Sequence, residues 1–229
     1  MSTLSGFQNV TAQGELFLPR PRVSERRWDS DFAYPRYIET TPEEIGFRPF
    51  SVFSYLNALY DRPGVVGFKL MYAQLGLYPE ILLYLIRHQV RVVHLIRKNH
   101  LDVIISYAIK AQIGQSHLLS GQVAPENIRI ELDTNRLVKN LDQLRKKQSI
   151  ARMVLVSFRL PHIEIAYEDL LRNQEHFRRI YEFLSINPEM YIRSPNVNKV
   201  RKGEHQDLIK NYDEVKETLV HSRFAALLD

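Results

Sequence analysis

The sequence predicts an α/β protein in which a parallel sheet lies between helices in three layers. Two observations support this fold class. Short runs rich in β-branched residues, which are typical of buried parallel strands, occur at 65–71 and 92–96. The segment between them, 79–87, carries apolar residues at helical spacing. A strand, a helix and a second strand in this order predict a parallel pair joined by a right-handed crossover.

Size and composition indicate one ordinary globular domain. The chain has 229 residues, 45% of them hydrophobic and 25% charged, so we expect a single domain over 1–229. It contains no cysteine, which excludes disulfides, thiolate catalysis and zinc–thiolate sites. The longest apolar run, 81–86, is too short to span a bilayer, and the amino terminus lacks signal-peptide features. We therefore expect a cytoplasmic protein.

The charge of the chain is basic. A net charge of +5 and a pI near 9.3 favour an anionic partner such as a nucleotide, a nucleic acid or a membrane surface. A solvated basic surface is the simpler explanation. Four arginines surround Trp28, at positions 20, 22, 26 and 27. This cluster either contacts an anionic acceptor or belongs to a solvated loop.

The first sixty residues predict irregular chain followed by helix. The stretch 19–22 is extended, because its prolines exclude a helix interior. A helix start is predicted at 41–44, with proline in the first helical position and acids behind it. Residues 50–59 then repeat apolar side chains at helical spacing. Further on, the polar segment 116–134 predicts an acceptor-side loop.

An arginine stands where the strand at 92–96 ends and a helix begins. Asn99 can cap this helix, with Asp102 three positions later as its acidic partner. In open α/β sheets, ligands bind beyond the carboxyl ends of the strands. The fork of Arg97 beside free helix N–H groups suits a phosphate, and Ser106 can add a hydroxyl. The alternative is a salt-bridged arginine and a surface serine.

The rest of the chain continues the alternation of helices and strands. Apolar residues at helical spacing predict helices at 137–147, 177–184 and 208–219, and alternating polar and apolar residues predict a strand at 162–167. Before the last helix, three cations precede a glycine in the segment 198–203, which must be a loop.

The segment from Arg97 to Ser106 resembles the 3′-phosphate-binding motif of the sulfotransferases that use 3′-phosphoadenylyl sulfate (PAPS). In that motif a strand-end arginine and a helical serine bind the 3′-phosphate. The interval of nine residues is similar to bacterial carbohydrate sulfotransferases of the nodulation-factor and trehalose types, whereas cytosolic sulfotransferases are usually one residue shorter. The resemblance implies that Arg97 and Ser106 bind the nucleotide.

The Tyr-Glu-Asp-Leu sequence at 167–170 is similar to a signature found across sulfotransferases. There the tyrosine packs near adenine and the glutamate starts a helix. The resemblance therefore implies that Tyr167 lies near the adenine ring. A strand-end tyrosine before helix-starting acids is also ordinary structure, so this segment supports the family more than it identifies a site.

Arg201, Lys202 and Gly203, followed by Lys-Asn at 210–211, resemble the carboxy-terminal loop of the family that closes on the 3′-phosphate and adenosine. The interval is one residue longer than in the cytosolic enzymes. The resemblance implies that these three residues hold the nucleotide. A solvated basic loop is the alternative.

Lys69 and Glu15 are the catalytic residues that the resemblance implies. Lys69 ends a Gly-Phe-Lys strand similar to one in the family, which would bring it near the donor phosphosulfate; the alternative is a lysine that extends to solvent. Cytosolic members carry a histidine base soon after that lysine, but residues 70–72 contain none. Glu15, in a Gly-Glu-Leu-Phe sequence similar to the bacterial enzymes, is then the candidate base, or else a surface acid.

The Gly/Ser/Thr-rich loop that wraps the 5′-phosphosulfate in this family has no counterpart in the sequence. The amides of that loop form an anion-binding nest. Residues 2–8 resemble the end of the helix that follows it. The expected fold is therefore an N-terminally truncated, P-loop-kinase-like sulfotransferase fold. The missing strand lies in the middle of the sheet, so strands 65–70 and 92–96 are expected to have unpaired edges.

The resemblance implies transfer of a sulfonate group from PAPS to an acceptor hydroxyl, with PAP (adenosine 3′,5′-bisphosphate) as product and no metal. A carbohydrate or small molecule is the expected acceptor. Either a monomer or a homo-oligomer is compatible with the sequence. One alternative is a non-catalytic adenine-nucleotide-binding remnant of the same fold. Another is nucleic-acid binding through the basic loops, which we do not expect because the chain lacks a recognisable module.

Overall fold

The computed structural model of the chain describes residues 4, 7, 9–19, 34–40, 48–113, 128–173, 175–187, 189 and 204–228. It divides into two compact units, and each is described by itself. Unit 1 comprises Met1–His94, Val154–Ile165 and Leu170–Val197; unit 2 comprises Leu95–Met153, Ala166–Asp169 and Asn198–Asp229. The expectation of a single domain stays a prediction.

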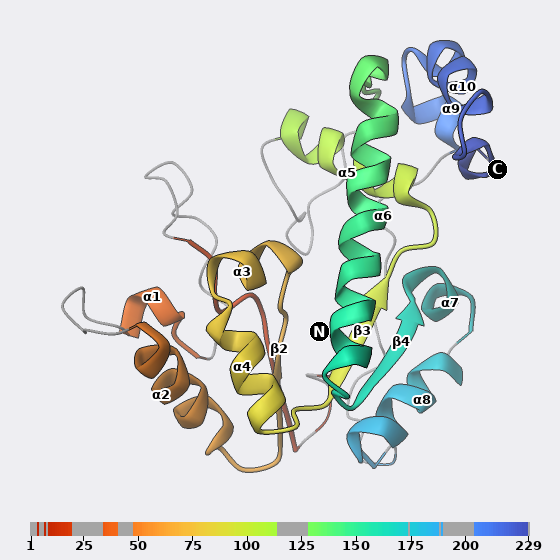
Figure 1. Cartoon of the computed structure of the whole chain (residues 1–229). Helices are drawn as coiled ribbons and strands as arrows, with labels where there is room; N and C mark the ends of the chain where they lie inside the picture. The colour runs from red at the N-terminus through yellow and green to blue at the C-terminus, as the bar shows by residue number, and fades with distance from the viewer. Residues whose placement is uncertain are drawn as a thin grey trace. The chain divides into compact units, whose positions relative to one another are not determined.

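The fold is mixed α/β, with short parallel strands flanked by helices (Figure 1). The described strands are β1 (Val10–Gln13), β2 (Val65–Phe68), β3 (Val92–Ile96) and β4 (His162–Ala166). They form two two-stranded sheets, β1 with β2 and β3 with β4. The three strands expected from sequence correspond to β2, β3 and β4. The strand expected at 65–71 ends at Phe68, and the one expected to reach Tyr167 ends one residue earlier.

β1 was not expected from sequence, which predicts irregular chain there. It pairs with β2 in parallel, with Val10 opposite Val65 and Gln13 opposite Phe68. The sequence Val-Thr-Ala-Gln has neither an apolar run nor a turn signal on both sides, so its periodicity carries little information. Its strand conformation comes from the backbone hydrogen bonds that β2 supplies.

Unit 1 buries a core between β1, β2 and the helices beside them. These helices are α1 (Tyr37–Thr40), α2 (Arg48–Tyr60), α3 (Tyr72–Leu77) and α4 (Glu80–Arg87). Helix α8 (Glu175–Leu184) also belongs to unit 1, and its Tyr181 contacts Phe7. Phe17 is fully buried, and its ring packs on Tyr37, Tyr55 and Phe68. Apolar side chains of α2 and α4, including Leu56 and Ile81, complete the core. The helices expected at 50–59 and 79–87 are α2 and α4.

Unit 2 is built from helices around a second core. They are α5 (His100–Ile113), α9 (His205–Leu208), α10 (Tyr212–Val220), the 3₁₀ turn Ala225–Leu227 and the larger part of α6 (Thr134–Ser157). Leu101 and Ile105 of α5 pack in one cluster with Leu141 of α6 and Leu219 of α10. The short helix α7 (Tyr167–Arg172) follows β4.

Several sequence predictions lie outside the described residues. They are the helical tail expected at 2–8 apart from residues 4 and 7, the arginine cluster around Trp28, the helix start at 41–44, the loop at 116–127 and the basic loop at 198–203. In the part of the chain that the structure describes, no helix is long and apolar enough to cross a membrane.

Candidate functional site

Lys69 and Glu15 meet at the carboxyl end of the β1–β2 pair in unit 1. Because the two strands are parallel, the residues that follow each of them leave the same edge of the sheet. The ammonium of Lys69 lies 2.7 Å from Glu15 Oε1, and the two side chains are 44% and 22% exposed. The backbone N–H of Lys69 donates to the carbonyls of Gln13 and Gly14, both at 3.1 Å. The pair is therefore held on a fixed backbone and stays open to solvent.

Gln74 of α3 is a third member of this cluster, and the sequence did not indicate it. Its side chain is buried, donates to Glu15 Oε2 at 3.3 Å and accepts from the backbone N–H of Met71 at 2.9 Å. Both carboxylate oxygens of Glu15 are thus engaged, one by Lys69 and the other by Gln74. A glutamine at the start of a helix is too common to mark a site, so no sequence signal could have found it.

Arg97 and Tyr167 meet in unit 2, each at the first position after a strand. The guanidinium carbon of Arg97 lies 3.5 Å from the centroid of the Tyr167 ring, which is a close cation–π contact. The Arg97 side chain keeps 38% of its surface exposed. Stacking on the ring restricts the arginine without occupying its hydrogen-bonding fork. Of the residues expected to bind nucleotide, these two are in contact.

The acids that follow Tyr167 hold the loop between β3 and α5. Glu168 Oε2 accepts from the backbone N–H of Lys98 at 3.1 Å, and Asp169 Oδ1 lies 2.6 Å from the Lys98 ammonium. Glu168 Oε1 lies 4.0 Å from Arg97 and is a buried atom without a hydrogen-bond partner among the described residues. Two cations thus face two carboxylates. The charges of these four side chains therefore cancel. An anion at this cluster would be bound by hydrogen bonds from the Arg97 guanidinium and not by a net positive charge.

Asn99 caps α5, as predicted. Its Oδ1 accepts from the backbone N–H groups of Leu101 at 3.0 Å and Asp102 at 3.3 Å. Ser106 is exposed one turn further along, and its hydroxyl donates to the carbonyl of Asp102 at 2.7 Å. The hydroxyl is therefore engaged within its own helix, and the structure places it on the same helix as the cap but not in contact with Arg97.

The loop with Arg201, Lys202 and Gly203 lies outside the described residues, but the chain directly after it is described. His205 Nε2 lies 2.9 Å from Asp102 Oδ1 in the first turn of α5. Glu204 Oε2 accepts from Gln206, and the N–H of Glu204 donates to Asp207. The segment that follows the basic loop is thus attached to the helix that Asn99 caps.

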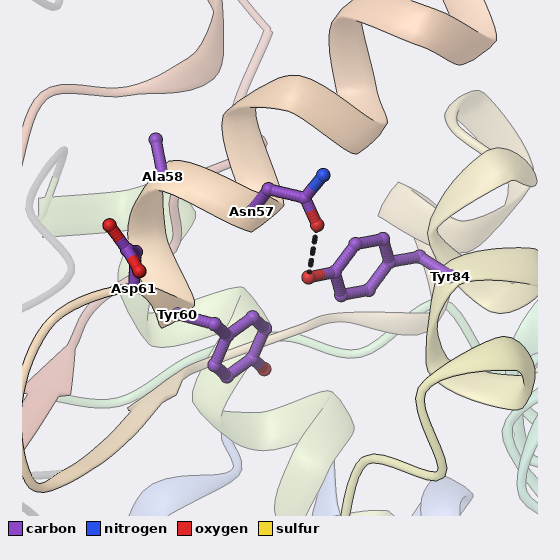
Figure 2. A pocket seen from close by; sticks show the side chains of 5 residues that line it. All are labelled: Asn57, Ala58, Tyr60, Asp61 and Tyr84. Carbon is purple, nitrogen blue, oxygen red and sulfur yellow. Dashed lines mark hydrogen bonds between the residues drawn. The ribbon is translucent and has the colours of Figure 1, made fainter.

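A hollow on unit 1 contains none of the expected site residues. It has a volume of about 450 Å³ and lies between α2 and α4 (Figure 2). Its lining consists of Asn57, Ala58, Tyr60, Asp61 and Tyr84. Tyr84 donates to Asn57 Oδ1 at 2.9 Å. Asp61 is the only formally charged residue in this lining, so the hollow is not suited to a nucleotide phosphate.

The described residues contain no group of histidine, aspartate and glutamate side chains that could hold a metal ion. No protein family, curated protein or solved structure matches the chain. The site must therefore be interpreted from the two clusters themselves, Glu15–Lys69–Gln74 in unit 1 and Arg97–Tyr167–Glu168 in unit 2.

Proposed function

We propose that the protein has a sulfotransferase fold of the P-loop-kinase-like, three-layer type and transfers a sulfonate group from PAPS to the hydroxyl of a carbohydrate or small molecule. The resemblance to this family covers most of the chain, from about Gly14 to Leu228. The class of fold, short parallel strands flanked by helices, is compatible with the proposal.

The contact between Arg97 and Tyr167 carries the proposal. These residues are seventy positions apart in the sequence, and the resemblance assigns both to the same nucleotide. Their contact, with 3.5 Å between the guanidinium carbon of Arg97 and the centroid of the Tyr167 ring, is compatible with a shared nucleotide site. A guanidinium fork pre-ordered by stacking loses less side-chain entropy when it binds a phosphate. The attachment of His205 to Asp102 supports a role for the neighbouring basic loop in the same site.

The Glu15–Lys69 cluster supplies the groups that sulfonate transfer needs. The acceptor oxygen attacks sulfur, the bond from sulfur to the nucleotide phosphate breaks, and the phosphate keeps the electron pair. A cation such as Lys69 stabilises the charge that develops on the leaving group. Glu15 takes the proton of the acceptor hydroxyl. Its two oxygens contact Lys69 and Gln74, and the remaining lone pairs of the carboxylate can accept the proton of the acceptor hydroxyl.

Calorimetry with nucleotides tests the proposal. We expect PAP to bind more tightly than AMP or ADP, since the matching motifs serve the 3′-phosphate. Loss of a charge-assisted bidentate contact costs about 1.5–3 kcal/mol, so Arg97→Ala should weaken PAP binding roughly tenfold to a hundredfold. Arg97→Lys keeps the charge but loses the fork and should fall in between. Arg178→Ala, which removes an exposed arginine of α8, is the control for net charge.

Equal affinity for AMP and PAP would contradict the proposal. Tight binding of PAP would favour the nucleotide-binding remnant if PAPS transfers no sulfonate to any of a panel of hydroxyl acceptors, even when the chain is extended upstream by a strand and a phosphate-binding loop. Salt-sensitive retention of DNA or RNA, unaffected by PAP, would favour the nucleic-acid alternative.

A further inference from the structure

Three side chains of unit 1 form a hydrogen-bonded chain that the sequence did not suggest. The hydroxyl of Tyr72, at the start of α3, lies 2.6 Å from Nε2 of His94 on β3. On the other side of the imidazole, Nδ1 of His94 lies 3.1 Å from Oε2 of Glu164 on β4. The tyrosine and histidine rings meet edge to face, with centroids 5.9 Å apart. A phenol, an imidazole and a carboxylate are therefore connected in series.

The direction of the hydrogen bonds follows from the chemistry of the three groups. An ionised carboxylate only accepts, so Glu164 requires the proton of the imidazole on Nδ1. A neutral imidazole with its proton on Nδ1 presents a lone pair at Nε2. The hydroxyl of Tyr72 then donates to Nε2. This is the order of the groups in a serine–histidine–aspartate triad, with a phenol in the place of the serine hydroxyl.

The members of the hydrogen-bonded series differ in burial in a way that suits proton transfer. His94 is only 6% exposed, whereas Tyr72 is 37% exposed. The imidazole is therefore protected from water, and the tyrosine is exposed at the surface. Tyr72 also lies three residues after Lys69, and its helix contributes Gln74, which contacts Glu15. The start of α3 thus joins the histidine chain to the Glu15–Lys69 cluster.

We propose that Tyr72 is a proton-accepting residue for a hydroxyl substrate, with His94 and Glu164 as its positioning residues. The phenol oxygen takes the proton of the substrate hydroxyl while the proton of the phenol passes to Nε2 of His94. The imidazolium that forms is stabilised by the carboxylate of Glu164. The freed substrate oxygen keeps the electron pair of the broken O–H bond and uses it to attack.

The identity of the electrophile, the sulfur of PAPS, rests on the proposed function. The activation of the Tyr72 phenol does not depend on that function. Tyr72 is then an alternative to Glu15 as base. It supplies a proton-accepting group in the segment where the cytosolic sulfotransferases carry a histidine. Glu15 would hold the accepted proton itself, whereas the phenol of Tyr72 would pass its own proton to His94 as it accepts another.

The reactivity of the phenol can be measured without nucleotide or acceptor. N-Acetylimidazole transfers its acetyl group to a phenol oxygen: the oxygen–carbon bond forms, the carbon–nitrogen bond breaks, and imidazole leaves with the proton. At neutral pH we expect Tyr72 of the wild-type protein to be acetylated about tenfold or more faster than Tyr107. Tyr107 lies on α5, is 55% exposed, and serves as the reference in the same molecule. The two rates are read by mass spectrometry of their peptides.

Variants separate activation from simple exposure. His94→Gln should lower the acetylation rate of Tyr72 to about that of Tyr107. Glu164→Gln keeps an acceptor for Nδ1 but removes the charge, so it should give an intermediate rate. Circular dichroism and denaturant unfolding show whether each variant is folded, and Glu164→Gln carries the test if His94→Gln does not fold.

A Tyr72 rate no higher than that of Tyr107, or a rate that neither variant lowers, would overturn the inference. Because the assay needs no nucleotide, its outcome is independent of PAP binding. In a preparation that transfers sulfonate, Tyr72→Phe then distinguishes the two candidate bases: loss of single-turnover rate assigns the base to Tyr72, and an unchanged rate rejects that assignment.

Discussion

Single tyrosines in unit 1 make its stability dependent on pH. Burial is the largest cause that raises the pKa of Tyr55, Tyr60 and Tyr84 above the ordinary value, and neighbouring tyrosines add to it for Tyr55 and Tyr60. A group whose pKa is raised in the folded state contributes stability that is present below its unfolded pKa and is lost as pH rises. We therefore expect the free energy of unfolding to fall above about pH 10.

Denaturant unfolding between about pH 8 and about pH 11 measures this loss. Tyr60→Phe keeps the buried ring but removes its ionisable hydroxyl, so its stability should fall less steeply in the alkaline range. Tyr107→Phe, at an exposed position of α5, is the control. Identical alkaline slopes for all three proteins would show that Tyr60 does not contribute.

At the scale of single residues, Glu15 gives a second prediction. If Glu15 and not Tyr72 is the base, Glu15→Gln in a preparation that transfers sulfonate should lower the single-turnover rate by roughly a hundredfold, because a neutral amide cannot accept the proton. Nucleotide affinity should change little, since the substitution is nearly isosteric. Glu217→Gln, at an exposed position of α10, controls for the change of charge. An intact single-turnover rate would remove Glu15 from the mechanism.

At the scale of elements, the entry into β2 depends on one glycine. Gly64 has a φ of 86°, which a side chain rarely adopts, and a Cβ there would lie 2.3 Å from the carbonyl oxygen of Asn9. That carbonyl accepts the N–H of Val65 at 2.8 Å, the bond that precedes the β1–β2 ladder. A side chain at Gly64 would therefore push β1 away from β2.

We expect Gly64→Ala to lower the free energy of unfolding by on the order of 1–3 kcal/mol. The matched control is Gly67→Ala, within β2 itself, where a Cβ meets nothing within 4 Å; it should have a much smaller effect. Chemical denaturation of both variants makes the comparison. Equal losses at the two positions would mean that the approach of Asn9 is unimportant.

The cap of α5 is a second test at this scale. Asn99 accepts from two N–H groups of the helix and donates through Nδ2 to the carbonyl of Leu227 at 3.0 Å. Asn99→Ala should cost about 1 kcal/mol of stability for the lost cap. Asn99→Asp keeps the cap acceptor and loses only the donor to Leu227, so it should cost less. If denaturation experiments show a larger loss of stability for Asn99→Asp than for Asn99→Ala, the stabilisation comes from the Leu227 contact and not from the cap.

At the scale of the whole molecule, the pairing of the strands affects solubility and stability. In the described part of the chain, β2 has only β1 as a strand neighbour and β3 has only β4. Strand edges without a partner favour aggregation or pairing with another chain. We predict that a form extended upstream by a strand and a phosphate-binding loop is more soluble and more stable, and that sulfonate transfer appears only in that form.

Sedimentation and denaturation of the two forms measure the effect, with an extension of equal length made of glycine and serine as the control. Robust transfer by the 229-residue chain as a well-folded monomer would contradict the prediction. It would mean that the phosphosulfate is held by groups other than the expected loop.

The sequence by itself determined the elements whose signal is local. Hydrophobic periodicity predicted β2, β3, β4, α2 and α4, because the repeat of apolar residues reports directly which face an element buries. The position of Arg97 after a strand and the Asn99 cap could also be predicted, since strand ends and caps depend on neighbouring residues. In the candidate clusters, these local signals extend to Lys69, Arg97 and Tyr167, each of which directly follows a strand.

Only the tertiary structure decided which residues meet. Neither β1 nor Gln74 carries a local signal, because β1 takes its hydrogen bonds from β2 and Gln74 reaches Glu15 from fifty-nine positions away. The contact of Arg97 with Tyr167 and the series Tyr72–His94–Glu164 join different strands and helices. Such contacts depend on the path of the backbone and the direction of each side chain, and a pattern along one segment records neither.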